Sequence, residues 1–224
     1  MCGRFIQILN PEKIKVMLPD IEIDEAAAGA SHPRYNIAPT QDILTVINTP
    51  VPRLTLTRWG LIPSWSKDTS IGSRMINARA ETLTSKPSFR DPFRKRRCII
   101  FADGFYEWKR EERAKTPFLI RMKNGEPFAF AGLWDRWTDK ENNQEILSST
   151  IITTDANALV ADIHNRMPVI LPPEAYGFWL SAAPAESDLT GYLKPFPEEG
   201  MEAYEISKKV NSPGNDSPDV MKPI

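Results

Sequence analysis

The chain has 224 residues, 41% of them hydrophobic, and a formal net charge of −1. This length can bury a sizeable core and fits one domain over residues 1–224, while the near-zero charge excludes a strong overall attraction to nucleic acid, so any such binding needs a local basic surface. The only cysteines, Cys2 and Cys98, and the only histidines, His32 and His164, are too few for a disulfide scaffold or a structural zinc site, so we expect no metal and no cofactor.

Six apolar or alternating runs along the chain predict strands. They cover residues 43–47, 54–59, 98–102, 118–122, 128–133 and 149–153. Weaker helical patterns predict helices over 11–18, 80–85 and 157–163, and a fourth that begins at the pair Pro172 and Pro173 and continues through Trp179. Because 20 prolines interrupt longer periodic segments, the pattern predicts an α+β fold. The chain after about Lys208 is predicted to be irregular and packed on the body.

No apolar run approaches the roughly 20 residues that a membrane-spanning helix needs. The start also lacks the basic and then apolar pattern of a secretory signal. We therefore expect a cytoplasmic protein without membrane contact, and a monomer.

The chain starts with Met1-Cys2-Gly3-Arg4. Methionine aminopeptidase removes an initiator Met before a small side chain, which would leave Cys2 as a terminal 1,2-aminothiol. Its amine titrates near about 7.7 to 8.0 and its thiol near about 8.5, and the positive charge of Arg4 is expected to raise the thiolate share. An aldehyde would condense with the amine to an imine, which the sulfur would close to a thiazolidine. The alternative is that Cys2 is an ordinary second residue.

Two segments could contact a ligand. The strand over 54–59 leads into a Pro/Gly-punctuated loop whose tip carries Trp65, which is either an exposed aromatic for base stacking, worth about 1 to 3 kcal/mol, or a core tryptophan. Residues 77–82, Asn-Ala-Arg-Ala-Glu-Thr, are either a helix N-terminus that favours phosphate or a simple capping sequence.

A basic run over residues 90–97 could line a groove that follows a nucleic-acid backbone, although a solvated face is favoured. Its members are Arg90, Arg94, Lys95, Arg96 and Arg97.

Acid–base chemistry is suggested by two motifs. In residues 97–108 an apolar strand runs through Asp103 and Gly104 into Phe-Tyr-Glu-Trp, and desolvation by aromatic neighbours would raise the pKa of Glu107 and suit it to proton transfer. The alternative is a solvent-facing Glu.

The second motif is Asp-Ile-His-Asn-Arg-Met-Pro, residues 162–168, in which His164 lies close to Arg166. His164 would carry a proton there and Arg166 would bind an anion. The alternative is that His164 is a structural histidine.

Taken together, these motifs resemble the SOS-response-associated peptidase (SRAP) family over nearly the whole chain. The matching segments are Cys2-Gly3-Arg4-Phe5, RYNIAPT from Arg34, RWGLIP from Arg58, NARAET from Asn77, RRCIIFADGFYEW from Arg96, FAGLW from Phe130, IITTDAN from Ile151, HNRMPVIL from His164 and VNSPGND from Val210.

The resemblance implies a single α+β domain with a barrel-like, mostly antiparallel β-core and peripheral short helices. It implies a sensor and shield of abasic sites in single-stranded DNA, or at its junction with duplex, which forms a reversible thiazolidine crosslink through Cys2 and is nucleoid-associated when bound. Such chemistry would be lyase-like.

The resemblance also implies roles for individual residues. Cys2 would be the nucleophile, Asn77 would orient it and the sugar, Glu107 would promote ring opening and reversal, and His164 would assist proton transfer. The remaining residues are assigned to the DNA strand: Arg4, Arg79 and Arg166 as phosphate contacts, with Thr153 and the loops of Pro39 and Trp65 along it. Some members carry two adjacent tryptophans at this loop tip, whereas here Ser66 follows Trp65.

Two other classes of function remain open. A cysteine-dependent peptidase would use Cys2 with His164 or Glu107 to cleave an amide, which could be its own Met1-Cys2 bond. A passive single-strand binder would show salt-sensitive binding that is indifferent to the lesion.

Overall fold

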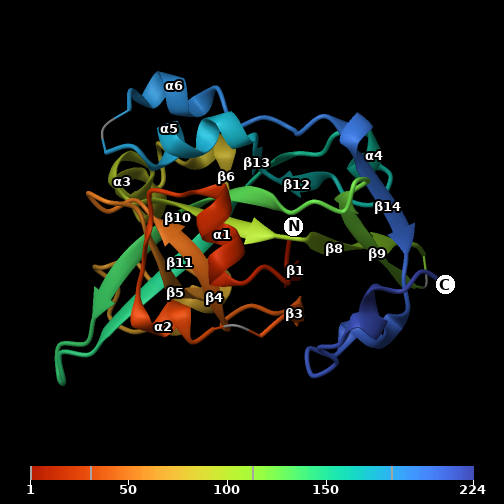
Figure 1. Cartoon of the computed structure of the whole chain (residues 1–224), viewed down its shortest axis with the longest axis horizontal. Coiled ribbons are helices and arrows are strands. Elements are labelled where there is room, and N and C mark those ends of the chain that lie inside the picture. The colour runs from red at the N-terminus through yellow and green to blue at the C-terminus, as the bar shows by residue number, and fades with distance from the viewer. Residues whose placement is uncertain (1, 31, 113, 183) are drawn as a thin grey trace.

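In the computed structural model five strands close into a barrel, whose strands lie in the left half of the molecule in Figure 1. The model describes residues 2–30, 32–112, 114–182 and 184–224. Antiparallel pairs join neighbouring strands in the order β5-β4-β7-β10-β11, and a parallel contact of Ser148 and Ser149 with Arg58 and Trp59 closes the ring between β11 and β5. The strands are β4 (Asp42–Ile47), β5 (Arg53–Trp59), β7 (Arg97–Ala102), β10 (Phe128–Thr138) and β11 (Glu145–Asp155).

A second, five-stranded sheet extends from the barrel towards the C-terminus in Figure 1. Its order is β14-β9-β8-β1-β3, and all neighbours are antiparallel. Its strands are β1 (Phe5–Gln7), β3 (Arg34–Ile37), β8 (Gly104–Arg110), β9 (Lys115–Met122) and β14 (Met201–Glu205). Because β7 continues through Asp103 into β8, the two sheets share one junction, and the N-terminal strand lies beside it.

Four short strands attach to the barrel and set up the functional face. Both β6 (Asn77–Arg79) and β12 (Arg166–Pro168) pair with β11, while β13 (Ile170–Leu171) pairs with β10 and β2 (Glu22–Ile23) with β5. Thr153 of β11 is aligned with Arg79 of β6 and with Pro168 of β12. Segments that are far apart in the sequence are thereby brought together on either side of β11.

The helices are short and lie around the sheets. Asn10 and Asn157 cap α1 and α4 by accepting hydrogen bonds from Lys13 N at 3.0 Å and Val160 N at 2.9 Å. Within the described residues no helix is both long and apolar enough to cross a membrane. The α-helices are α1 (Pro11–Met17), α2 (Glu25–Ala28), α3 (Pro87–Lys95), α4 (Ala158–Ala161), α5 (Tyr176–Leu180) and α6 (Glu186–Thr190), and the 3₁₀ turns are η1 (Ser70–Arg74), η2 (Ala80–Thr82), η3 (Pro173–Ala175), η4 (Glu198–Gly200), η5 (Lys208–Asn211) and η6 (Pro218–Met221).

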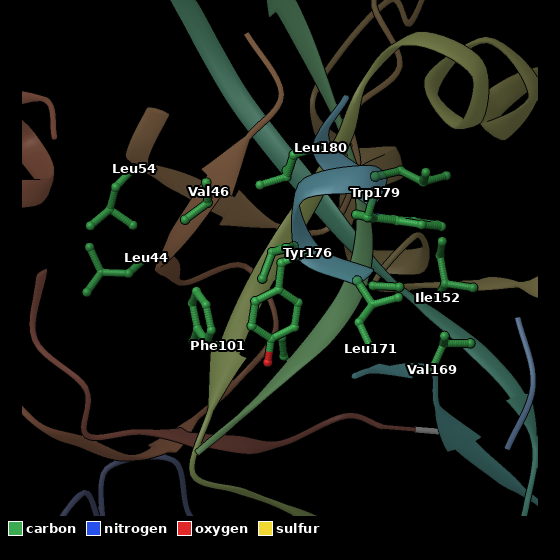
Figure 2. Close-up of a cluster of buried hydrophobic side chains, with 14 of the residues drawn as sticks. Leu44, Val46, Leu54, Phe101, Ile152, Val169, Leu171, Tyr176, Trp179 and Leu180 are labelled. Atoms are coloured by element: carbon green, nitrogen blue, oxygen red, sulfur yellow. The ribbon is translucent and has the colours of Figure 1, made fainter. Parts of the chain in front are cut away.

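Helix α5 covers one side of the barrel. Figure 2 shows Tyr176 and Trp179 of this helix packed over strand residues that include Phe101, Ile152 and Leu171, all of them buried. Burial of each such side chain stabilises the fold by about 1.5 to 3 kcal/mol. A second buried cluster joins the barrel to the smaller sheet, and Cys2 is one of its members.

The predicted fold class is confirmed, and each of the six predicted strands lies within an observed strand. The helix predicted over 80–85 is wrong, because only the three residues of η2 form a 3₁₀ turn there. The interpretation of Arg97 as part of a groove or a solvated face is also wrong. Arg97 is buried and donates to the carbonyls of Phe93, Arg94, Trp179 and Ser181, which join α3 to α5.

Candidate active site

The Cys2 end of the chain lies along strand β8. Tyr106 N donates to Arg4 O at 2.9 Å, which continues the antiparallel pairing of β1 with β8 beyond Phe5. Asn77 Nδ2 donates to the carbonyl of Cys2 at 2.7 Å. Two strands from different sheets, β8 and β6, therefore fix the position of Cys2. Met1 lies outside the described residues, so its removal stays a prediction.

The Cys2 thiol is buried, and its pKa is raised well above the ordinary value by desolvation and, to a smaller degree, by the negative charge of Glu107. The expectation that Arg4 raises the thiolate share is wrong. The guanidinium of Arg4 donates instead to Asn36 Oδ1 at 2.7 Å and to Val210 O at 2.8 Å, and it lies over the ring of Trp108. The thiol is therefore held in its neutral form at pH 7.

Glu107 lines a pocket of about 520 Å³. This residue is 3% exposed, so the solvent-facing alternative is wrong. Trp108 Nε1 donates to Asn211 Oδ1 at 2.8 Å, which places the C-terminal segment on the pocket wall. The lining residues are Glu107, Trp108, Arg110, Lys115, His164 and Asn211.

The orientation of His164 is set by the backbone of β12. Arg166 N donates to His164 Nδ1 at 3.0 Å, and His164 N donates to Val160 O at the end of α4. With Nδ1 accepting a hydrogen bond, a neutral imidazole carries its proton on Nε2. The ring can therefore offer a proton from Nε2 while its position stays fixed.

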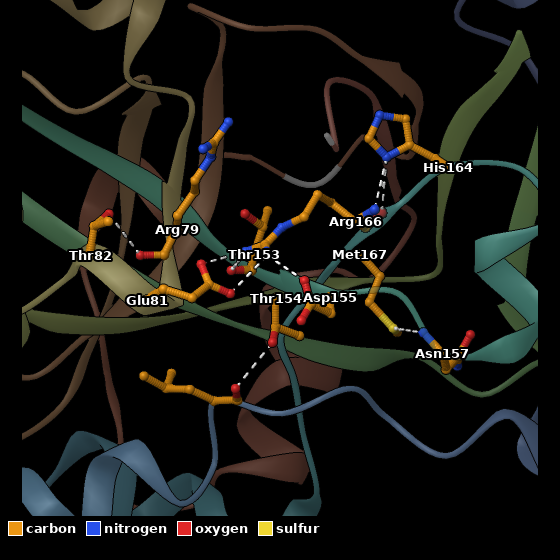
Figure 3. A network of polar contacts seen from close by, with 11 residues as sticks. Arg79, Glu81, Thr82, Thr153, Thr154, Asp155, Asn157, His164, Arg166 and Met167 are labelled. Atoms are coloured by element: carbon orange, nitrogen blue, oxygen red, sulfur yellow. Dashed lines mark hydrogen bonds and ion pairs between the residues drawn. The ribbon is translucent and has the colours of Figure 1, made fainter.

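A second hollow, of about 490 Å³, lies on the other side of His164. Figure 3 shows its polar cluster, in which Arg166 forms two hydrogen bonds to Glu81, at 2.8 and 3.0 Å, one to Asp155 at 2.8 Å and one to Thr153 O at 2.7 Å. These bonds from Arg166 lower the pKa of Glu81. The lining residues are Arg79, Glu81, Thr82, Asp155, His164, Asn165 and Arg166.

His164 lines both hollows, which makes it the residue that joins them. Glu107 lines one of the hollows, and the other is lined by Arg79, exposed to solvent, and by Arg166, whose side chain is 13% exposed. The carboxylates of Glu81 and Asp155 already pair with Arg166, so Arg79 is the guanidinium of this hollow that the ion pairs of the described residues leave to solvent.

The predicted DNA contacts Pro39, Trp65 and Thr153 stay predictions. Neither Pro39 nor Trp65 lines either hollow among the described residues, and Trp65 is 61% exposed, which rules out the core alternative. Thr153 is buried and contributes its carbonyl to Arg166. Residues 77–79 form strand β6, so the interpretation as a helix N-terminus is wrong.

The sequence did not identify Arg110, Lys115 and Asn211 as pocket residues or Asn36 as the partner of Arg4. A signal for the two asparagines was present, because the segments from Arg34 and from Val210 carry Asn36 and Asn211. Among the described residues, no cluster of His, Cys, Asp and Glu could hold a metal ion.

Comparison with known proteins gives a consistent result. A family model described as SOS response associated peptidase (SRAP) matches residues 1–213. The abasic site processing protein YoqW of Bacillus subtilis (strain 168) is 48% identical over 226 residues, 99% of each chain. YedK of Escherichia coli (strain K12), also named an abasic site processing protein, is 30% identical over 228 residues and all of both chains. A crystal structure of a protein from Bacteroides thetaiotaomicron superimposes over the whole of both chains with a TM-score of 0.90 and 31% identity.

Proposed function

Because the chain belongs to the SOS response associated peptidase (SRAP) family, we propose that it processes abasic sites in single-stranded DNA by forming a reversible thiazolidine crosslink through Cys2 once Met1 is removed. The relatives named abasic site processing proteins support the substrate. We propose that the protein acts as a monomer, on single strands or at their junctions with duplex.

The reaction would begin with the sugar. An abasic deoxyribose is mostly a closed hemiacetal, and a proton taken from its hydroxyl and returned to the ring oxygen opens it to the aldehyde. Glu107 and His164 line one pocket, which supports them as the groups that carry these two transfers. The amine of Cys2 then adds to the aldehyde carbon and water leaves, which gives an imine.

The sulfur closes the ring in the second step. A neutral thiol loses its proton as sulfur adds to the imine carbon, while the imine nitrogen gains a proton. The negative charge of Glu107 is close enough to raise the pKa of this thiol, so Glu107 is placed to accept the proton. Reversal uses the same transfers in the opposite order.

One observation carries the proposal. The Cys2 carbonyl is fixed by Asn77 at 2.7 Å, and the Cys2 thiol is electrostatically coupled to a buried Glu107 that shares a pocket with His164. A terminal aminothiol beside two proton carriers is suited to trapping an aldehyde. A cysteine peptidase depends on a thiolate, which the raised pKa of Cys2 disfavours.

The test uses purified protein and a single-stranded oligonucleotide with one abasic site. We predict a band shift that survives a denaturing gel, and a protein mass that shows loss of Met1. Cys2→Ala should form no denaturant-resistant adduct but should still bind the oligonucleotide without covalent linkage. Cys2→Ser keeps the amine, so borohydride should trap its imine although no stable adduct forms without the reductant.

The proposal fails if an adduct persists in Cys2→Ala, or if the wild-type adduct forms while Met1 is still attached. Cys98→Ser is the matched control, because Cys98 is the other buried cysteine and lies on β7. Cleavage of peptides by the wild-type protein without any adduct would instead support the peptidase.

A further inference from the structure

A pair of basic side chains on the β8–β9 hairpin has no role in the site described above. Arg110 ends β8 and Lys115 begins β9, and the two residues are cross-strand partners. Both are exposed, and both line the pocket that contains Glu107 and His164. They therefore extend the site in the direction away from Arg79 and Arg166.

The placement of two like charges opposite each other is unfavourable by itself. Directly opposed like charges destabilise an antiparallel pair. The ion pairs within the described part of the chain include neither Arg110 nor Lys115. A bound anion between the two side chains would neutralise the repulsion.

The basic pair lines two hollows. Arg110 and Lys115 share a hollow of about 420 Å³ at the hairpin tip with Glu111, Glu112 and Ala114, and they share the larger pocket with Glu107 and His164. An anionic chain whose sugar lies at Glu107 and His164 would therefore pass the two basic side chains as it leaves the pocket.

We propose that Arg110 and Lys115 form a second phosphate-binding site, which holds the DNA strand on the side of the lesion opposite to Arg79 and Arg166. The proposal rests on the proposed function, because it assumes that the abasic sugar lies at Glu107 and His164. A strand that is held on both sides of the sugar keeps the aldehyde within reach of Cys2.

Binding to an undamaged single-stranded oligonucleotide tests the pair independently of the covalent step. In the Cys2→Ala background, we predict that Arg110→Ala/Lys115→Ala raises the dissociation constant about fivefold to tenfold. The slope of log affinity against log salt should become shallower by about 0.7 for each phosphate group that the variant no longer neutralises. Lys15→Ala/Lys140→Ala is the control, since it removes the same charge from residues outside both hollows.

The position of the lesion in the oligonucleotide tests on which side of the abasic site Arg110 and Lys115 hold the strand. Protein with Cys2 intact is given abasic oligonucleotides that extend only 5′ or only 3′ of the lesion. The double variant should raise the half-saturating DNA concentration for one of the two and leave the other unchanged, with the same crosslinking rate at saturation. Arg110→Lys/Lys115→Arg, which keeps both charges, should restore wild-type behaviour.

The second site is refuted if the double variant matches the lysine control, or if both oligonucleotides are affected equally. Absence of any adduct in the wild-type protein would refute the crosslinking function instead. The binding measurement on undamaged DNA would then still report on the basic pair.

Discussion

Asp103 shows how one partly buried carboxylate sets the start of the site. It lies in the turn between β7 and β8, and its Oδ2 accepts hydrogen bonds from the backbone N–H groups of Ile8 and Leu9, just after β1. Its own N–H donates to Ile6 O at 2.9 Å. These contacts fix the end of β1, and hence the direction in which the chain runs back to Cys2.

The stability contributed by Asp103 should depend on pH. Desolvation raises its pKa above the ordinary 3.8, so the folded chain binds this proton more tightly than the unfolded chain. The contribution of Asp103 to the free energy of unfolding is thus fully present below about pH 3.8 and is lost as pH rises through the pKa of the folded state. Asp103→Asn keeps an acceptor oxygen without the charge. We predict that this variant does not lose stability between pH 4 and pH 7 and that its free energy of unfolding at pH 7 is higher than that of the wild type.

Chemical denaturation between pH 4 and pH 7 measures this effect. Asp103→Ala is the comparison, because it removes the acceptor at every pH and should cost about 1 to 3 kcal/mol. If Asp103→Asn lost as much stability at pH 7 as Asp103→Ala, the charge itself would be required and the predicted sign would be wrong.

At the scale of secondary-structure elements, Arg97 links the helices α3 and α5. Its guanidinium donates to Phe93 O and Arg94 O in the last turn of α3, and to Trp179 O and Ser181 O at the end of α5. Burial lowers its pKa to about 10, yet the group stays charged at neutral pH. The charge is stabilised by carbonyl groups at the negative ends of the two helices.

We predict that Arg97→Met lowers the free energy of unfolding by about 3 kcal/mol or more, because it leaves several carbonyls without their donor. Arg97→Lys should also be destabilising, since one ammonium cannot reach four acceptors in two directions. Arg94→Met is the control, as its ion pair with Glu186 is exposed to solvent and contributes little to stability. Equal effects at positions 94 and 97 in urea denaturation would contradict the prediction.

Local patterns predicted the barrel strands but not how they close. The runs over 43–47 and 98–102 are apolar enough to define β4 and β7, whereas the parallel contact of β5 with β11 joins residues about 90 positions apart and leaves no local signal. Helix α3 was missed because Pro92 interrupts it and charged residues dominate its exposed side. Arg97 looked like one more surface charge because its acceptors Trp179 O and Ser181 O lie 82 and 84 positions further along the chain.

Motifs predicted the reactive end better than its surroundings. The sequence indicated Cys2, Glu107 and His164, and the structure brings Glu107 and His164 into one pocket. The pairing of Arg166 with Glu81 and Asp155 depends on β6 and β12 flanking β11, which no spacing in the sequence reveals. The thiol environment of Cys2 was likewise set by burial rather than by its neighbour Arg4.

Across the whole molecule, the two ends of the chain meet at the site. Asn36 Nδ2 donates to the carbonyls of Val210, Ser212 and Asn215, at 3.1, 3.0 and 2.8 Å, while Asn36 Oδ1 accepts from Arg4. Asp216 accepts from Arg34 and from the N–H groups of residues 35 and 36. The C-terminal segment therefore supports Arg4 and supplies Asn211 to the pocket wall.

Asn36 thus acts as a positioning residue, and its substitution should slow the reaction of Cys2. In Asn36→Ala the carbonyls of Ser212 and Asn215 lose their donor, while Arg4 and Val210 O keep only the hydrogen bond to each other. We predict a free energy of unfolding lower by about 2 kcal/mol. Amide exchange over residues 208–216 should quicken, and the rate of adduct formation at saturating abasic DNA should fall. Asn124→Ala is the control, because that side chain caps an exposed turn through Glu126 N.

Faster exchange in the tail with an unchanged rate of adduct formation would show that the C-terminal segment is only a structural cover. A slower adduct with an unchanged tail would place Asn36 in direct contact with DNA instead.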